Sequence, residues 1–250
     1  MQVRTVYGHL MELDKNDQLE LRIRGIWEPF ETKIFIENLK SNYNILDIGS
    51  HIGYYSLIGA LYSEKGKVVS IEPEPNNFKI LQQNILINEY RDKIIPFNCA
   101  LSDKNGKQKF YISYNNTAGH TLKVNKIGSE NNIIEKTIEV NCITLDELFS
   151  RLKLKIDFIK IDAEGSELDI FRGGKQFLKD NKELKIITEF CPKFYAVSGQ
   201  DIKDYYNLLR ENGFDIWQLD DRVQKPLVIN RYEDITYPNG FYTNLFCVRS

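Results

Sequence analysis

The chain has 250 residues, of which 42% are hydrophobic and 27% charged, and its formal net charge is -2. This length allows one large domain with a substantial core, and the composition is that of a globular protein rather than a disordered or fibrous one. A net charge near zero gives no support to a nucleic-acid partner, because such partners select basic surfaces.

No stretch of the sequence is as long and apolar as a membrane span of about 18 residues, and residues 1–17 lack the apolar segment of a signal peptide. The four cysteines lie far apart without a C-x-x-C pair: Cys99, Cys142, Cys191 and Cys247. We expect them to be reduced and buried. The sequence therefore predicts a cytoplasmic protein with no membrane segment.

Residues 1–40 are predicted to form a small β element and a helix over 29–40, as an extension or cap before a domain over 41–250. Glu28 is expected to cap that helix, and a role at the ligand edge is the alternative. In the domain, strands are predicted at 44–49, 66–73, 93–101, 156–165, 183–190, 213–220 and 243–250. Helices are predicted at 54–65, 76–90, 144–152, 166–174 and 201–214.

Alternating strands and helices predict βαβ units and a mainly parallel sheet with helices on both faces. No helix separates the last two strands, so we expect an antiparallel hairpin at one edge. The polar stretch at 113–136 is predicted to be a long loop between two paired strands at 107–114 and 136–143. It would form a substrate-loop insertion near residues 105–140.

The stretch NILDIGSHIGYYS, residues 44–56, reads as an apolar strand that ends in an Asp-x-Gly-x-x-x-Gly turn. Ligands of open α/β sheets bind beyond the carboxyl ends of the strands. We expect Gly49 to let the backbone approach a ligand and Gly53 to let the next helix pack closely. The turn has neither G-x-G-x-x-G nor G-x-x-x-x-G-K-[ST] spacing, so a phosphate-rich cofactor is not expected.

Acidic residues stand in this turn and at the end of the next strand. Asp47 would repel a phosphate but suits a cation, and S-adenosylmethionine carries an ammonium and a sulfonium group without phosphate. Glu72 is placed to accept both ribose hydroxyls, and Pro73 to cover the adenine. Together they predict an S-adenosylmethionine site, and a structural glycine turn beside an exposed Glu72 is the alternative.

Two other functions stay open at this point. A nicotinamide-dependent oxidoreductase would need a third loop glycine and room for a diphosphate, and the spacing of Asp47 and Gly53 argues against it. A non-catalytic Rossmann-like binding module would not need acidic residues at three strand ends, although a fold alone does not decide function.

Several longer motifs resemble those of the FkbM family of S-adenosylmethionine-dependent methyltransferases. They cover most of residues 20–190 and a terminal NLFCV, and in chain order they are WEP (27–29), ILDIGSHIGYYS, VVSIEPEPNNFKIL, NCALSDKNGKQKFY, TLDEL, FIKIDAEGSELDIFRGG and ITEF. The resemblance implies a class I, Rossmann-like fold: a mostly parallel seven-stranded sheet with one antiparallel strand near the edge. It also implies O-methylation of a hydroxyl, often on a sugar or small metabolite.

The same resemblance implies roles for individual residues. The methionine part of the cofactor would be held by Asp47, Gly49, Ser50, His51 and Gly53. The aromatic faces of Tyr54 and Tyr55 would lie near the sulfonium. Glu72 would bind the ribose, and the adenine would be bordered by Asn98, Cys99 and Ala100. His51 stands where the family often has Asn, which also forms hydrogen bonds.

Candidate catalytic groups follow the later strands. Asp162 is expected at the ligand edge, where it could contact the cofactor's ammonium, accept the acceptor's proton or ligate a metal. With Glu164 and Glu189 it forms a candidate Mg²⁺ site. The alternatives are that Glu164 caps the following helix and that Glu189 pairs with a Lys or Arg. His120, in the polar loop, is a further candidate base. The expected acceptor is a small molecule or glycan.

Overall fold

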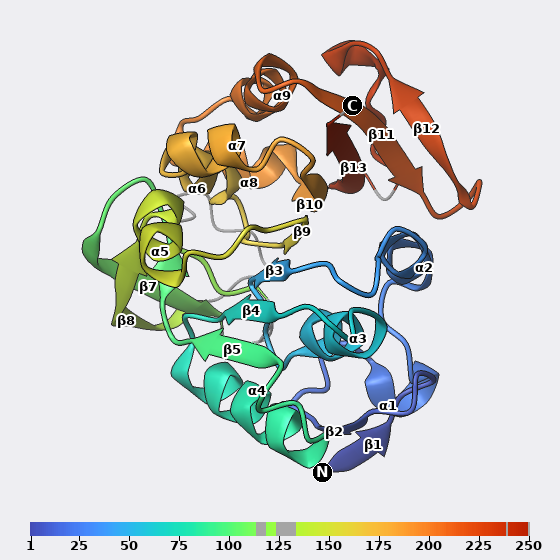
Figure 1. The fold of residues 1–250 in the computed structure, drawn as a ribbon. Helices are drawn as coiled ribbons and strands as arrows, with labels where there is room; N and C mark the ends of the chain where they lie inside the picture. The colour runs from blue at the N-terminus through green and yellow to red at the C-terminus, as the bar shows by residue number, and fades with distance from the viewer. Residues whose placement is uncertain (114–118, 124–133, 239, 250) are drawn as a thin grey trace.

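The computed structural model describes residues 1–113, 119–123, 134–238 and 240–249. An eight-stranded sheet runs through the middle of the molecule (Figure 1). From edge to edge its strands are β12 (Lys225–Ile229), β11 (Phe214–Asp220), β13 (Thr243–Arg249), β10 (Lys185–Phe190), β9 (Phe158–Ile161), β3 (Ile45–Ile48), β4 (Val68–Ile71) and β5 (Ile94–Phe97). The predicted α/β class with a mainly parallel sheet is confirmed.

The sheet differs from the prediction in its number of strands and at one edge. It has eight strands instead of seven, and two of them, β13 and β12, run antiparallel to their neighbours. The last two predicted strands, β11 and β13, pair antiparallel as expected, and β13 lies near the edge, between β10 and β11, while β12 forms the edge itself. The edge strand β12 was not predicted, because Pro226 has no N–H to donate and reads against a strand; such a residue is tolerated at a sheet edge.

Helices cover both faces of this sheet, as predicted. One face packs against α5 (Leu145–Leu152), α6 (Glu167–Arg172), α7 (Lys175–Asp180) and α9 (Ile202–Glu211). The other packs against α2 (Pro29–Glu37), α3 (Tyr54–Tyr62) and α4 (Pro75–Ile87). Neither α7 nor α8 (Pro192–Ser198) was predicted from the sequence. In α4, Leu81 and Ile85 are buried against the sheet, whereas Leu86 is exposed.

Successive side chains of a strand point to opposite faces of the sheet, and in the central strands the charged side chains lie on one of these faces. In β3 and β9, Ile45 and Phe158 belong to the core under α2 and α3, while Leu46 and Ile159 belong to the opposite core. Asp47 and Lys160 pair across the two strands one step further on, so both side chains fall on the α3 side. Charged groups are thus buried beneath α2 and α3 at the carboxyl end of the sheet.

The N-terminal residues share a core with the rest of the chain. They form β1 (Gln2–Arg4), β2 (Leu10–Glu12), α1 (Leu21–Arg24) and α2. Met11, Phe30 and Phe35 are fully buried against residues of α3, α4 and β9. The β1–β2 hairpin lies along α4 (Figure 1). Helix α2 lies beside the carboxyl end of β10 and the amino end of β13, where the side chain of Asn244 donates to Glu31 at 3.1 Å.

Asn84 of α4 and Asn88, the C-cap residue of that helix, form hydrogen bonds with the unpaired edge of β2. Asn84 accepts from the Glu12 N–H at 2.6 Å and donates to the Glu12 carbonyl at 3.0 Å, and Asn88 makes the same two bonds with Leu10, at 3.0 and 2.8 Å. Asn84 also donates to the carbonyl of Ile52 in the glycine turn at 2.8 Å. One buried side chain therefore ties the N-terminal hairpin to the turn.

A small second sheet lies beyond β5. It consists of β6 (Ala100–Leu101), β8 (Ile134–Ile143) and β7 (Gly106–Ser113), with β7 and β8 antiparallel as predicted. Most of the loop predicted at 113–136 lies outside the described residues. The remaining short element is a 3-10 turn, Tyr232–Asp234. None of the helices that the structure describes is both long and apolar enough to span a bilayer.

Replacing Asn84 with Ala should lower the free energy of unfolding by about 1–3 kcal/mol, because buried backbone groups of Glu12 and Ile52 lose their partners. Denaturant titration followed by circular dichroism would measure the loss. Asn88→Ala is the matched control: Asn88 is only half-buried, so water can replace its bonds and the loss should be smaller. A loss for Asn84→Ala no larger than that of the control would contradict the tethering role.

Candidate active site

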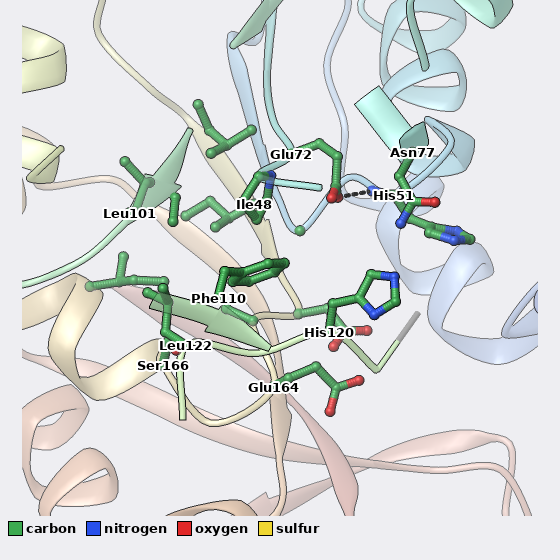
Figure 2. Close-up of a pocket in the computed structure, with 17 residues that line it drawn as sticks. Ile48, His51, Glu72, Asn77, Leu101, Phe110, His120, Leu122, Glu164 and Ser166 are labelled. Atoms are coloured by element: carbon green, nitrogen blue, oxygen red, sulfur yellow. Dashed lines mark hydrogen bonds between the residues drawn. The ribbon is translucent and has the colours of Figure 1, made fainter. Parts of the chain in front are cut away.

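Two adjoining cavities lie at the carboxyl ends of the central strands. The chain passes from β3 outward to β4 and β5 and later returns to place β9 on the other side of β3, so the strand order reverses at β3, where α/β folds bind ligands. The first cavity has about 530 Å³ of empty space and is lined by Gly49, His51, Glu72, Pro73, Ala100, Leu101, Phe110, His120, Asp162 and Glu164, among others (Figure 2). We call it the strand-end cavity.

The second cavity has about 490 Å³ of empty space and lies beneath the N-terminal segment. It shares Gly49, His51 and Asp162 with the first, and its further lining residues are Leu19, Trp27, Asp47, Ser50, Tyr54, Tyr55 and Lys160. We call it the lysine cavity. The two cavities therefore adjoin across these shared residues, at the place in the sheet where α/β folds bind ligands.

The glycine turn is built by residues with positive φ. Gly49, His51 and Gly53 have φ of 75°, 49° and 94°. A Cβ on Gly49 would lie 1.8 Å from the carbonyl oxygen of Asp162, and one on Gly53 would lie 2.6 Å from Leu81 of α4. Gly49 is therefore required by the close approach of the loops after β3 and β9, before any ligand is considered. Gly53 allows close packing of α4 against the turn, whereas the expectation concerned the next helix in the chain, α3.

Glu72 lies at the end of β4, inside the strand-end cavity. One of its carboxylate oxygens accepts the N–H of His51 at 2.8 Å (Figure 2), and the other accepts the N–H of Glu74 at 2.8 Å. Burial raises the pKa of Glu72 to about 8, against the opposing effect of these two hydrogen bonds. Each oxygen keeps a lone pair for a further donor. Glu72 is thus a fixed acceptor beside the glycine turn, and the alternative of an exposed Glu72 is wrong.

The residues expected around an adenine are divided between two places. Pro73 and Ala100 line the strand-end cavity. Asn98 and Cys99 instead line a separate groove next to α5. The amide of Asn98 donates to the carbonyls of Glu72 and Pro73 at 2.9 and 3.1 Å, so this residue fixes the loop that carries Glu72.

Polar atoms of the turn are buried without partners. Among the described residues, neither the hydroxyl of Ser50 nor either ring nitrogen of His51 has a hydrogen bond. Both side chains are less than a tenth exposed. Burial lowers the pKa of His51 to about 4, so the ring is neutral near pH 7. Buried polar groups normally have partners, so these atoms are suited to a polar ligand.

Asp47 and Tyr55 make contacts within the protein. The hydroxyl of Ser56 donates to Asp47 at 2.5 Å, and burial raises the pKa of Asp47 to about 6 despite this bond. The Tyr55 ring, expected near a sulfonium, faces the ammonium of Lys160 at 5.0 Å from the ring centre. Tyr54 packs edge-on against Tyr55, and both line the lysine cavity.

Lys160 is the buried cation of the site, with 2% of its side chain exposed. Its Nζ lies 3.5 Å from Glu28 Oε2 and 3.7 Å from Asp162 Oδ2. Glu28 is the N-cap residue of α2, but its side chain does not cap the helix and instead accepts the Tyr55 hydroxyl at 2.8 Å. Burial would lower the pKa of Lys160, yet the surrounding carboxylates raise it, so the ammonium is protonated.

The three candidate catalytic carboxylates occupy different surroundings. Asp162 keeps 34% of its side chain exposed through the cavities, and burial raises its pKa while Lys160 opposes the rise. Burial and neighbouring carboxylates raise the pKa values of Glu164 and Glu189 well above the ordinary range. Glu164 does not cap the next helix. The N-cap residue of α6 is Ser166, and Glu167, the first residue of the helix, accepts the Ala163 N–H at 2.9 Å.

The expected Mg²⁺ site is not supported. Within residues 1–113, 119–123, 134–238 and 240–249, no three His, Cys, Asp or Glu side chains come together in a way that could hold a metal ion. The cation that lies beside Asp162 is Lys160.

His120 lines the strand-end cavity opposite Glu72 (Figure 2). Its Nδ1 accepts the N–H of Ser113 at 3.0 Å, and its ring packs edge-on against Phe110. Burial lowers the pKa of His120 to about 4. A neutral ring that accepts at Nδ1 carries its proton on Nε2. His120 is therefore equipped to donate a hydrogen bond into the cavity rather than to act as a base.

Sequence reasoning gave no role to Lys160 and only alternatives to Glu28. A usable signal was present for the first: a lysine between two isoleucines of a strand buried on both faces needs a charged partner. The partner itself could not be found this way, since Glu28 lies far away in the sequence.

Comparisons with known proteins agree with this geometry. The family model described as methyltransferase FkbM domain matches residues 47–216. The hexuronic acid methyltransferase AglP of Haloferax volcanii is 28% identical over 192 residues, 76% of this chain and 71% of that protein. The 2-O-methyltransferase NoeI of Sinorhizobium fredii is 30% identical over 158 residues, 58% of this chain and 62% of that protein.

A solved structure shares the fold at low sequence identity. The O-methyltransferase from Bacillus cereus, in complex with SAH, superposes with a TM-score of 0.53 at 16% identity and covers 89% of this chain and 82% of its own. The family model spans more than half of the chain and includes the glycine turn, Glu72 and Asp162. This chain therefore belongs to the FkbM methyltransferase family.

Proposed function

We propose that this protein transfers a methyl group from S-adenosylmethionine to a hydroxyl of a sugar or another small polyhydroxylated acceptor. The observation that carries the proposal is the position of Glu72: an acceptor fixed by two backbone N–H groups, inside a cavity and directly beside the glycine turn. The names of the relatives from Haloferax volcanii and Sinorhizobium fredii support a sugar or hydroxyl acceptor.

The donor fits the residues of the two cavities. Glu72 would accept both ribose hydroxyls, and Pro73, Ala100 and Leu101 would provide apolar contacts to the adenine. In the lysine cavity, the partnerless polar atoms of Ser50 and His51 would hold the amino-acid part. Bound there, S-adenosylmethionine supplies a methyl group on a positively charged sulfur.

Asp162 is the residue best placed to receive the acceptor's proton. Asp47 is already bonded to Ser56, and His120 is arranged as a donor. Asp162 faces both cavities and is partly exposed, with Lys160 beside it to favour the charged form. In the transfer, the acceptor oxygen forms a bond to the methyl carbon, the carbon–sulfur bond breaks, and the acceptor's proton moves to Asp162.

The N-terminal segment is proposed to act as a cap of the methyltransferase domain over residues 41–250. Leu19 and Trp27 form one wall of the lysine cavity, and Glu28 reaches the ion pair with Lys160. This arrangement would exclude water from the charged end of the donor, where exclusion helps to align donor and acceptor.

Glu72→Gln should weaken binding of S-adenosylhomocysteine by at least about tenfold, the equivalent of one lost charge-assisted hydrogen bond. Isothermal titration calorimetry would measure the change. Glu74→Gln is the matched control: the Glu74 side chain caps α4 by accepting the Asn77 N–H at 2.7 Å, so its loss should cost stability more than affinity. Equal affinity losses in both variants would remove Glu72 from the ribose site.

Asp162→Asn should reduce turnover by about 10²–10⁴-fold while S-adenosylhomocysteine still binds, because the amide cannot accept the acceptor's proton. Formation of S-adenosylhomocysteine would be followed with a panel of sugars, including hexuronic acids. Asp157→Asn serves as the control, since Asp157 precedes β9 at the end away from the site. Its carboxylate accepts the N–H of Asn44 at 2.8 Å and lies 3.8 Å from Lys155 Nζ. Unchanged turnover in Asp162→Asn would exclude this residue as the base.

A further inference from the structure

The lysine cavity contains one buried positive charge among several negative ones. Lys160 stands in β9 opposite Asp47 of β3, with its side chain under α2 and α3. The carboxylates near enough to raise its pKa come from four elements: Glu28 at the start of α2, Asp162 at the end of β9, Glu189 in β10 and Asp47 in β3. A fifth element, α3, contributes the ring of Tyr55.

The ammonium of Lys160 is held by charge rather than by ordinary hydrogen bonds. Its distances to Glu28 and Asp162, 3.5 and 3.7 Å, are longer than a normal N–H···O bond. Among the described residues its Nζ has no hydrogen-bond partner, although only 2% of the side chain is exposed. The group therefore occupies a central position between two carboxylates instead of pairing closely with one.

A divalent ion shared by Glu28 and Asp162 would have to occupy the place of this ammonium. The two side chains supply oxygen atoms at the carboxyl edge of the sheet, and Mg²⁺ prefers oxygen ligands in a tight octahedron. A divalent ion bound to these carboxylates would lie beside a buried ammonium, and like charges repel strongly where water is excluded. The residues of this site therefore do not suit a metal ion.

We propose that the Lys160 ammonium takes the place of a metal ion in this site, as a fixed cation that holds the Glu28 and Asp162 carboxylates at the edge of the donor cavity. Lys160 is a positioning residue: it stays protonated throughout and keeps Asp162 charged and oriented to receive the acceptor's proton. Methyl transfer by this protein then requires no divalent cation. The inference rests on the proposed function, because it assigns Asp162 to the reacting end.

The test compares divalent-ion binding by the wild type, Lys160→Met and Lys160→Arg. Mn²⁺ is the probe, and the electron paramagnetic resonance signal of free Mn²⁺ reports binding. The wild type and Lys160→Arg should bind no Mn²⁺ at 1:1 stoichiometry at Mn²⁺ concentrations up to about 10⁻³ M. This limit corresponds to the weakest affinities of protein sites for hard cations. Lys160→Met leaves the carboxylates without a counter-charge. This variant should bind about one Mn²⁺ per protein, at least tenfold more tightly than the wild type does.

Thermal unfolding provides a second readout. Lys160→Met should unfold at a lower temperature than the wild type, because removing one partner leaves buried charges unpaired. Mn²⁺ should raise that temperature in Lys160→Met but not in the wild type or in Lys160→Met/Glu28→Gln. The double variant removes both charges of one pair, so it keeps the comparison possible if the single variant folds poorly.

Stoichiometric Mn²⁺ binding by the wild type that Asp162→Asn abolishes would overturn the inference, as would Mn²⁺ binding of equal strength in the wild type and Lys160→Met. Binding of S-adenosylhomocysteine, measured on the same wild-type sample with EDTA present, separates the two proposals. Loss of that binding in a folded protein would contradict the proposed function. Retained binding together with a Mn²⁺ site would contradict only the role of Lys160.

Discussion

The site depends on the close approach of two backbone segments, the loops that follow β3 and β9. Gly49 has no side chain, and its Cα lies so near the Asp162 carbonyl that a single added carbon would overlap it. The contact brings the glycine turn, which follows the first of these strands, directly against Asp162, which ends the other. The same contact places Gly49 and Asp162 side by side, and both residues belong to the wall that the two cavities share.

The electrostatics of the site follow from this geometry and from the alternation of side chains along the strands. Asp47 and Lys160 are neighbours on one face because β3 and β9 pair in register. Burial beneath α2 and α3 removes water from them, and groups in such surroundings interact strongly. A single lysine therefore interacts with several carboxylates. One of them, Glu28 at the start of α2, lies outside the sheet and forms an ion pair with it.

The sequence was sufficient for the alternation of helices and strands, for the glycine turn and for the position of Glu72, because those features are local patterns in one stretch of chain. It was insufficient where structure depends on partners far apart. The edge strand with Pro226 is stabilised by pairing with β11, which no local pattern reports. The pair of Glu28 with Lys160 arises only when α2 folds over the end of the sheet. Gly49 was singled out for contact with a ligand, which stays a prediction, and its contact with Asp162 was not foreseen.

The side-chain bonds from α4 to β2 have a consequence for how the molecule behaves in a crowded solution. Residues four apart on a helix rise about 6 Å, and residues two apart on a strand about 6.8 Å. Asn84 and Asn88 can therefore bond to Glu12 and Leu10 at the same time. Their amide groups take the place of a third strand beside β2. An outermost strand normally invites another polypeptide to add to it. Here the two asparagine side chains occupy the unpaired edge of β2, so that edge is protected from pairing with another copy of the chain.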